Sequence, residues 1–195
     1  MKGTRWSHDY DSKILDFFKL GNRGTKFTTI RECFWLLPPR GFVLFCCNGT
    51  AIGDPGLEGF GIIARDHESN VIGTISVGLG MDSSYIDKSF AVVWAIEWAI
   101  NLKCDKIIIR SDSKTVIEDF QEESIQWCFK TRWLRAKSCL VQICYEHCYK
   151  ETNFSADSLA KKGVKLQMRE IEHHAGRPAH LIKIEMPNRK YYRFF

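Results

Sequence analysis

The sequence lacks the features by which membrane-bound and secreted proteins are usually recognised. None of its apolar runs approaches the roughly 18 residues that a membrane-spanning helix requires. The N-terminus does not have the charged-then-apolar layout of a secretory signal, and no internal repeat is visible. With 195 residues, 45% of them apolar, the chain is long enough for one domain with its own core and flanking tails.

The eight cysteines do not have the spacing of a disulfide framework or a zinc site, and no Cys-x-x-Cys pair occurs. Cys144, His147 and Cys148 are close in sequence, but they fall on a predicted strand and its exit, whereas zinc ligands usually come as two short-spaced pairs. A chain of this size does not need disulfides for a core, so we expect reduced thiols and an intracellular location, in the nucleus or cytoplasm.

Charge is unevenly distributed along the chain. Residues 1–40 and 164–195 each have a net charge of +4, whereas residues 41–163 have a net charge of −3. Basic tails suit binding to phosphate groups, although many solvated tails have the same composition. We expect residues 1–34 to form a weakly packed arm, with one or two helical turns at 14–18, residues 35–164 to form the domain, and residues 165–195 to form a basic tail whose aromatic end docks on the domain.

The middle of the chain alternates between strand and helix patterns. Short spacing between the apolar segments 41–47, 58–66 and 71–77 predicts antiparallel hairpins. A long helix is predicted at 85–102, because Ala91, Val92, Ala95, Ala99 and Leu102 recur at three- and four-residue steps. We expect Trp94 and Trp98 to lie in the core or an interface rather than to stack on bases.

The stretch Lys106–Ser113 contains the strongest local signal. Ile107, Ile108 and Ile109 form a continuous β-branched run, which predicts a buried, central strand. Asp112 follows its carboxyl end, where open α/β sheets place ligand chemistry. Ser113 and Asp112 are equally favourable at the start of the helix predicted at 113–120, so local sequence leaves both interpretations open.

A second predicted helix, at 125–138, interleaves cations and aromatic residues. This pattern suits contact with a nucleic-acid backbone, and the ordinary alternative is an amphipathic helix with its tryptophans inward and its cations solvated. A last strand is predicted at 141–148 and a last helix from Ser155 to about Val164. The candidate nucleic-acid-binding residues of the 125–138 helix are Lys130, Arg132, Arg135 and Lys137.

The later part of the chain carries a long motif. It begins His147-Cys-Tyr-Lys-Glu-Thr-Asn153 and continues with Ala156-Asp157-Ser-Leu-Ala160. Together with Ser111-Asp112-Ser113, this order resembles the RNase H-like domain, and within it the plant branch related to non-LTR retrotransposons. There, a strand ends in Asp-Ser, and a later strand is followed by His-x-x-Arg-Glu-x-Asn-x-x-Ala-Asp-x-Leu-Ala. The resemblance covers residues 35–163.

The resemblance implies an α/β fold with a mixed five-stranded sheet, three antiparallel hairpin strands plus parallel strands, flanked by helices. It also implies two-metal hydrolysis of the RNA strand of an RNA/DNA hybrid, with Mg²⁺ or Mn²⁺ held by four carboxylates. The matching positions here are Asn48, Lys88, Asp112 and Asp157, and His147 matches the family histidine. The implied partner is an RNA/DNA hybrid or a double-stranded RNA-like duplex; no membrane or protein partner is implied.

Two of the four matching positions have lost their carboxylate. The formal charge of the four positions is therefore −1 instead of −4, and the Lys88 ammonium would repel a cation. The alternative role of Lys88 is that of an internal counter-ion between Asp112 and Asp157, in a structural salt bridge. On the predicted helix, Glu97 lies about 13 Å beyond Lys88 and on the opposite side, and Asp87 lies about 100° around the helix from Lys88. Neither residue is therefore expected to replace the missing carboxylate while the helix keeps its predicted start.

Three functional hypotheses follow. The chain is a nucleic-acid-binding domain of nuclease ancestry with weak or absent catalysis, or an active nuclease that uses Asp112, Asp157 and a substitute ligand. The third hypothesis is a relic or protein-interaction domain with no role on nucleic acid. Salt-dependent hybrid binding separates the first hypothesis from the third, and metal-dependent cleavage separates the second from both.

Overall fold

The computed structural model describes residues 17, 30–53, 56–81 and 84–194. Residues 31–193 form one compact unit. A second unit comprises residues 1–30 and 194–195, of which only Phe17, Ile30 and Phe194 are described. Apart from Phe17, the helical turns expected at 14–18 lie outside the described residues.

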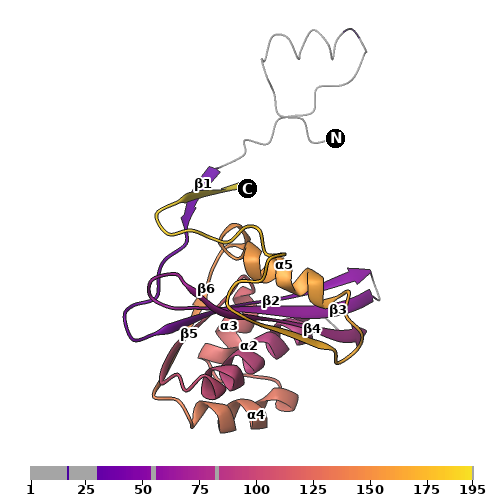
Figure 1. Ribbon diagram of the computed structural model, residues 1–195. Coiled ribbons are helices and arrows are strands. Elements are labelled where there is room, and N and C mark those ends of the chain that lie inside the picture. The colour runs from indigo at the N-terminus through magenta and orange to yellow at the C-terminus, as the bar shows by residue number, and fades with distance from the viewer. Residues whose placement is uncertain (1–16, 18–29, 54–55, 82–83, 195) are drawn as a thin grey trace. The chain divides into compact units, whose positions relative to one another are not determined.

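A mixed sheet of six strands, in the order β6-β5-β2-β3-β4-β7, forms the centre of the domain (Figure 1). The hairpin strands β2, β3 and β4 are antiparallel, and β5 and β6 run parallel to β2. The expected five-stranded mixed sheet is therefore present, with β7 added at its edge. The bounds are β2 (Val43–Gly53), β3 (Gly56–Arg65), β4 (Val71–Met81), β5 (Lys106–Ser111), β6 (Gln142–His147) and β7 (Ile171–Ala175).

Helices cover both faces of the sheet. Three helices lie on one face and α5 lies on the other (Figure 1). The bounds are α2 (Ser84–Asn101), α3 (Lys114–Gln121), α4 (Trp127–Lys137), the short 3₁₀ turn η1 (Lys150–Thr152) and α5 (Phe154–Gly163). The helices predicted from periodicity are thus present, each within a few residues of its expected bounds.

Strand β5 is buried on both faces, as its isoleucine run predicts. Ile107 and Ile109 point into the larger core beneath α2, and Ile108 points into the core beneath α5. Alternation of side chains along a strand explains why one apolar run serves two cores. The ring of Trp98 packs edge-to-face on Phe45, with centroids 5.5 Å apart, which confirms its expected place in the core.

One core prediction on α2 was wrong. Leu102 was expected on the buried face, but α2 ends at Asn101 and Leu102 is 36% exposed. Lys103 follows with φ +58°, and the backbone N–H of Cys104 donates to the carbonyl of Ala99. This turn directs the chain away from the helix axis before Leu102 can reach the core.

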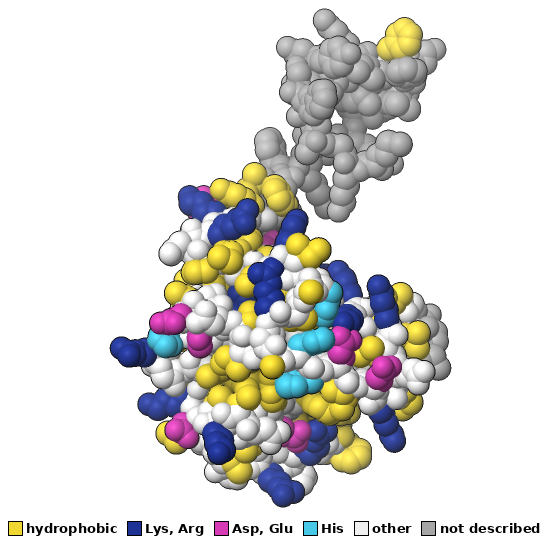
Figure 2. All heavy atoms as spheres, viewed as in Figure 1, with side chains coloured by type: hydrophobic (Ala, Val, Ile, Leu, Met, Phe, Trp, Pro, Cys, Tyr) yellow, Lys and Arg dark blue, Asp and Glu magenta, His cyan; other side chains and the backbone are white. Residues whose placement is uncertain are grey.

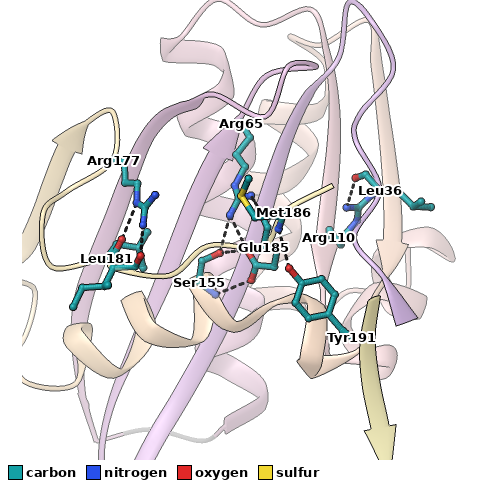
Figure 3. A network of polar contacts seen from close by, with 10 residues as sticks. Leu36, Arg65, Arg110, Ser155, Arg177, Leu181, Glu185, Met186 and Tyr191 are labelled. Carbon is teal, nitrogen blue, oxygen red and sulfur yellow. Dashed lines mark hydrogen bonds and ion pairs between the residues drawn. The ribbon is translucent and has the colours of Figure 1, made fainter. Parts of the chain in front are cut away.

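The C-terminal segment contains more regular structure than its weak periodicity predicts. Strand β7 extends the sheet beside β4, and β8 (Lys190–Phe194) pairs with β1 (Ile30–Phe34). Between them, Glu185 is fully buried against Arg65 and Ser155 (Figure 3). Tyr191 docks on the domain, with its ring 5.9 Å from that of Phe154. The division at residue 164 stays a prediction, and the segment after it is packed on the domain.

Candidate functional site

The candidate site lies at the carboxyl ends of β5 and β6 and beside the middle of β2, where its parallel pairing with β5 ends. Pairing places Cys47 beside Ser111 and Ser111 beside His147, so Asn48, Asp112 and His147 lie at one edge of three parallel strands. This arrangement follows from the parallel register, since parallel strands end on the same side of a sheet. Helices α2 and α5 add Lys88 and Asp157 from opposite faces.

Helix α5 reaches the site because it packs very closely on the sheet. A Cβ on Gly61 would lie 2.3 Å from the backbone nitrogen of Ala160, so no larger residue fits there without moving the helix. The side chain of Asn153, just before the helix, donates to the carbonyl of Cys47 at 3.0 Å. These contacts set the start of α5 beside β2 and bring Asp157 to Asn48.

Asp157 is held by two partners from within the chain. The side-chain amide of Asn48 donates to its Oδ1 at 3.2 Å. The Lys161 ammonium, one helical turn later, lies 2.5 Å from its Oδ2. Both carboxylate oxygens therefore have a partner, and one of these partners carries a positive charge.

Asp112 faces Lys88, at the second position where the family resemblance implies a carboxylate. The Lys88 ammonium lies 3.7 Å from Asp112 Oδ1, and the two side chains are 26% and 10% exposed, respectively. Among the described residues, no hydrogen bond reaches this oxygen, so Lys88 is its close electrostatic partner. The expected salt bridge is therefore present, but it joins Lys88 to Asp112, whereas Asp157 pairs with Lys161.

Asp87 lies beside Gly49, the neighbour of Asn48 on β2. Helix α2 starts at Ser84, one residue from its expected start, yet the Asp87 carboxyl group is buried against the backbone of Gly49. A Cβ on Gly49 would meet Asp87 Oδ1 at 2.5 Å. The first turn of α2 lies over β2, so Asp87 approaches this strand while Lys88 approaches Asp112.

His147 is exposed at the end of β6, with its ring 5.8 Å from that of Tyr149 in an edge-to-face contact. It lines a pocket of about 380 Å³ with Arg110 and Glu146, which form an ion pair at 2.6 Å. All eight cysteines are free thiols. Burial raises the pKa of the Cys148 thiol well above its usual value, which disfavours a thiolate metal ligand next to His147.

The cations predicted on α4 fall into two groups. Arg132 makes a two-point contact with Glu97, at 3.0 and 2.6 Å, and Lys137 pairs with Glu123 at 2.5 Å. Lys130 and Arg135 are exposed and make no ion pair with any described residue. Arg132 and Arg135 line a pocket of about 580 Å³ between α2 and α4.

The two tryptophans of α4 also differ. Trp133 is fully buried and donates to the Tyr145 hydroxyl at 2.8 Å, whereas Trp127 is 87% exposed. The helix therefore combines the amphipathic packing expected of an ordinary core helix with one aromatic residue open to solvent. None of the helices among the described residues is both long and apolar enough to cross a membrane.

Comparisons with known proteins agree with this geometry. A family model described as Reverse transcriptase-like matches residues 46–163. No curated protein matches the chain. The structural comparisons return solved structures of ribonuclease H domains, each about one fifth identical to this chain.

Three of these structures are representative. The N-terminal RNase H domain of a Mycobacterium tuberculosis protein has a TM-score of 0.59 at 19% identity, covering 64% of this chain and 94% of that one. RNase H1 from Halobacterium salinarum has a TM-score of 0.58 at 20% identity, covering 64% and 98%. LC11-RNase H1, solved with an RNA/DNA hybrid, has a TM-score of 0.56 at 20% identity, covering 63% and 96%. At these identities the likeness shows a shared fold.

Proposed function

The chain belongs to the reverse transcriptase-like family and has the RNase H fold, and from this premise we propose that it binds RNA/DNA hybrids without efficient cleavage. The motif from His147 to Ala160 supports an origin in the plant non-LTR retrotransposon branch. The substrate class would place the domain in the nucleus or cytoplasm, where such hybrids arise.

One observation carries the proposal. Each retained carboxylate is paired with a lysine of the same chain, Asp112 with Lys88 and Asp157 with Lys161. In a site built for two metal ions, these carboxylates would face the cations instead. Here two ammonium groups supply the positive charge.

The donor set does not fit two magnesium ions. Magnesium requires near-octahedral coordination by hard oxygen ligands and depends on carboxylate charge. Asn48 offers a neutral amide that already contacts Asp157, and Lys88 offers only N–H donors to Asp112. Asp87 adds a carboxylate beside Gly49, but that carboxylate is fully buried in the contact between α2 and β2. We therefore derive no metal-assisted step for this chain.

Binding to a nucleic-acid duplex requires exposed cations but no metal site. Lys161 is 58% exposed, so its ammonium is open to a phosphate group at the rim of the site. Lys130 and Arg135 add two exposed cations on α4 that, unlike Lys161, make no ion pair with a described residue. Contacts of this kind suit the sugar-phosphate backbone of a duplex and require no metal ion.

Cleavage of a labelled RNA/DNA hybrid in Mg²⁺ and in Mn²⁺ tests the loss of catalysis. The natural chain should be silent, and Asn48→Asp/Lys88→Glu should cleave, because it restores both carboxylates on an intact scaffold. Cleavage by the natural chain that is abolished by Asp112→Asn would refute the proposal. That result would favour the second hypothesis, with Asp87 as the substitute ligand.

Hybrid binding measured across a salt series tests the retained interaction. Affinity should persist in a metal chelator and fall with salt, and Lys161→Ala should reduce the slope of log K against log[salt] by about 1. Lys106→Ala is the matched control, because Lys106 begins the strand that Asp112 follows and lies about 20 Å from it. Salt-independent or undetectable binding would favour the relic or protein-interaction hypothesis.

A further inference from the structure

Two histidines and a glutamate converge on the opposite edge of the sheet from β6. Glu172 and His174 lie on β7, and His180 lies in the loop that follows. One ligand atom from each of the three, a carboxylate oxygen or a ring nitrogen, lies within 4.8 Å of the others. Figure 2 shows histidine and acidic side chains gathered side by side on one face of the molecule. None of these residues belongs to the site described above.

Strand geometry explains the position of the first two ligands. Side chains two residues apart point to the same face of a strand, so Glu172 and His174 share the face on which α5 packs. His173 points to the other face, where its ring meets the Trp98 ring at 5.5 Å. Pairing of Glu172 with Ser76 and of His174 with Thr74 sets the register of β7 against β4.

The third ligand is held in place by its neighbour. Leu181 is 1% exposed and lies in the core beneath α5. Its carbonyl accepts a hydrogen bond from Arg177 Nε at 2.8 Å, and the same guanidinium donates to the carbonyl of Ile182 (Figure 3). The backbone around His180 is therefore fixed on both sides, which reduces the ordering that a bound ion would require.

A positive charge already occupies the middle of the cluster. The Lys162 ammonium of α5 contacts Glu172 Oε1 and lies 3.3 Å from His180 Nδ1. An ammonium has donors only, so the His180 nitrogen that faces it is the unprotonated ring nitrogen, and its lone pair accepts from Lys162. A metal ion that displaced Lys162 would meet this lone pair.

We propose that Glu172, His174 and His180 form a binding site for a divalent transition-metal ion, zinc in the first instance, for which Lys162 competes. Two imidazoles and one carboxylate are a donor set found in zinc sites that keep an open fourth position. His174 Nε2 and Glu172 Oε1 now contact each other at 2.5 Å. Zinc bonds of about 2.0–2.2 Å would require this contact to open and the Lys162 ammonium to leave Glu172. Imidazole donors disfavour magnesium and calcium. The ion would tie β7 to the loop after it.

Zinc binding to the full chain, measured by competition with a chromophoric chelator, tests this site. His174→Gln and His180→Gln should each weaken binding at least about tenfold, since the loss of even an outer-shell partner costs that much. His173→Gln is the matched control, because His173 lies on the same strand but points away from the proposed site. This variant should bind zinc as tightly as the natural chain does. Lys162→Gln should bind zinc more tightly, because it removes the competing ammonium.

A cobalt spectrum separates this site from the thiols. Co²⁺ should give d–d absorption without a thiolate charge-transfer band, and this absorption should disappear in His174→Gln. Equal zinc affinity in the natural chain and in both histidine variants would overturn the proposal. So would a thiolate band that is lost on alkylation of the cysteines. Neither result would bear on hybrid binding at the other edge of the sheet.

Discussion

Glu185→Ala should be one of the most destabilising single substitutions in this chain. Glu185 and Arg65 are both fully buried, with Arg65 Nη2 2.6 Å from Glu185 Oε2. Arg65 Nη1 also donates to the Glu185 carbonyl at 2.7 Å, and its guanidinium lies over the Trp35 ring at 4.7 Å. The carboxylate accepts a hydrogen bond from the backbone N–H of Ser155, in the first turn of α5, at 2.8 Å (Figure 3).

The expected cost follows from what the substitution leaves behind. Removing one partner of a buried ion pair leaves an uncompensated buried charge, which costs about 3–5 kcal/mol. The Ser155 amide would also lose its acceptor at the helix start, where four backbone N–H groups need partners from outside the helix. Glu118→Ala is the matched control, because it breaks the exposed pair with Lys114 within α3 and should cost about 0.5 kcal/mol or less.

Urea unfolding of the full chain, with the slope m compared between variants, measures both effects. Arg65→Met/Glu185→Leu should lose less stability than Glu185→Ala, because apolar replacement of both partners leaves no buried charge. A cost below about 1 kcal/mol for Glu185→Ala would refute the reasoning. It would mean that the segment between β7 and β8 contributes little to holding α5, and with it Asp157, in place.

Three further predictions concern other parts of the fold. Burial raises the pKa of the Cys46 thiol to about 11, so iodoacetamide should modify exposed Cys139 in the native protein and reach Cys46 only after unfolding, as read by peptide mass spectrometry. Burial alone would raise the pKa of Asp66, but hydrogen bonds from Asn70 and the neighbouring backbone lower it overall. The Asp66 carboxylate stabilises the fold fully above the pKa of the unfolded chain, about 3.9, and this stabilisation is lost as pH falls through the pKa of the folded state. The natural chain and Asp66→Asn should therefore differ less in unfolding free energy in acid than at neutral pH. Gly61→Ala should cost about 1–3 kcal/mol in urea unfolding because its Cβ would meet the α5 backbone; an unchanged midpoint would contradict that packing.

Local patterns predicted most of the elements correctly. The isoleucine run of β5 and the three- and four-residue steps along α2 are signals of burial that depend on neighbours in sequence. The motif around Asp157 led to the RNase H-like domain, and the reverse transcriptase-like match over residues 46–163 with the fold of solved RNase H domains confirms it. The plant branch stays a prediction. The site residues follow from the same motif, and their roles stay predictions.

The parts that were not predicted depend on contacts between distant segments. Strand β7 has little hydrophobic alternation because it is an edge strand, and only pairing with β4 makes it a strand. The last helix was expected to begin at Ser155, but α5 begins at Phe154 and Ser155 is buried against Glu185.

The amino-acid sequence alone indicated the order of elements from β2 to α5 and the RNase H-like fold. The loss of two carboxylates at Asn48 and Lys88 is a prediction made from the same sequence. Only the tertiary structure decided which charges meet. The four-residue spacing of Asp157 and Lys161 is visible in the sequence as a possible helical pair. Lys161 pairs with Asp157, and Lys88 pairs with Asp112. This choice of partners depends on how closely α5 and α2 pack on opposite faces of the sheet. Ion pairs form over a few ångströms, and distances of that size are set by packing between elements far apart in the chain.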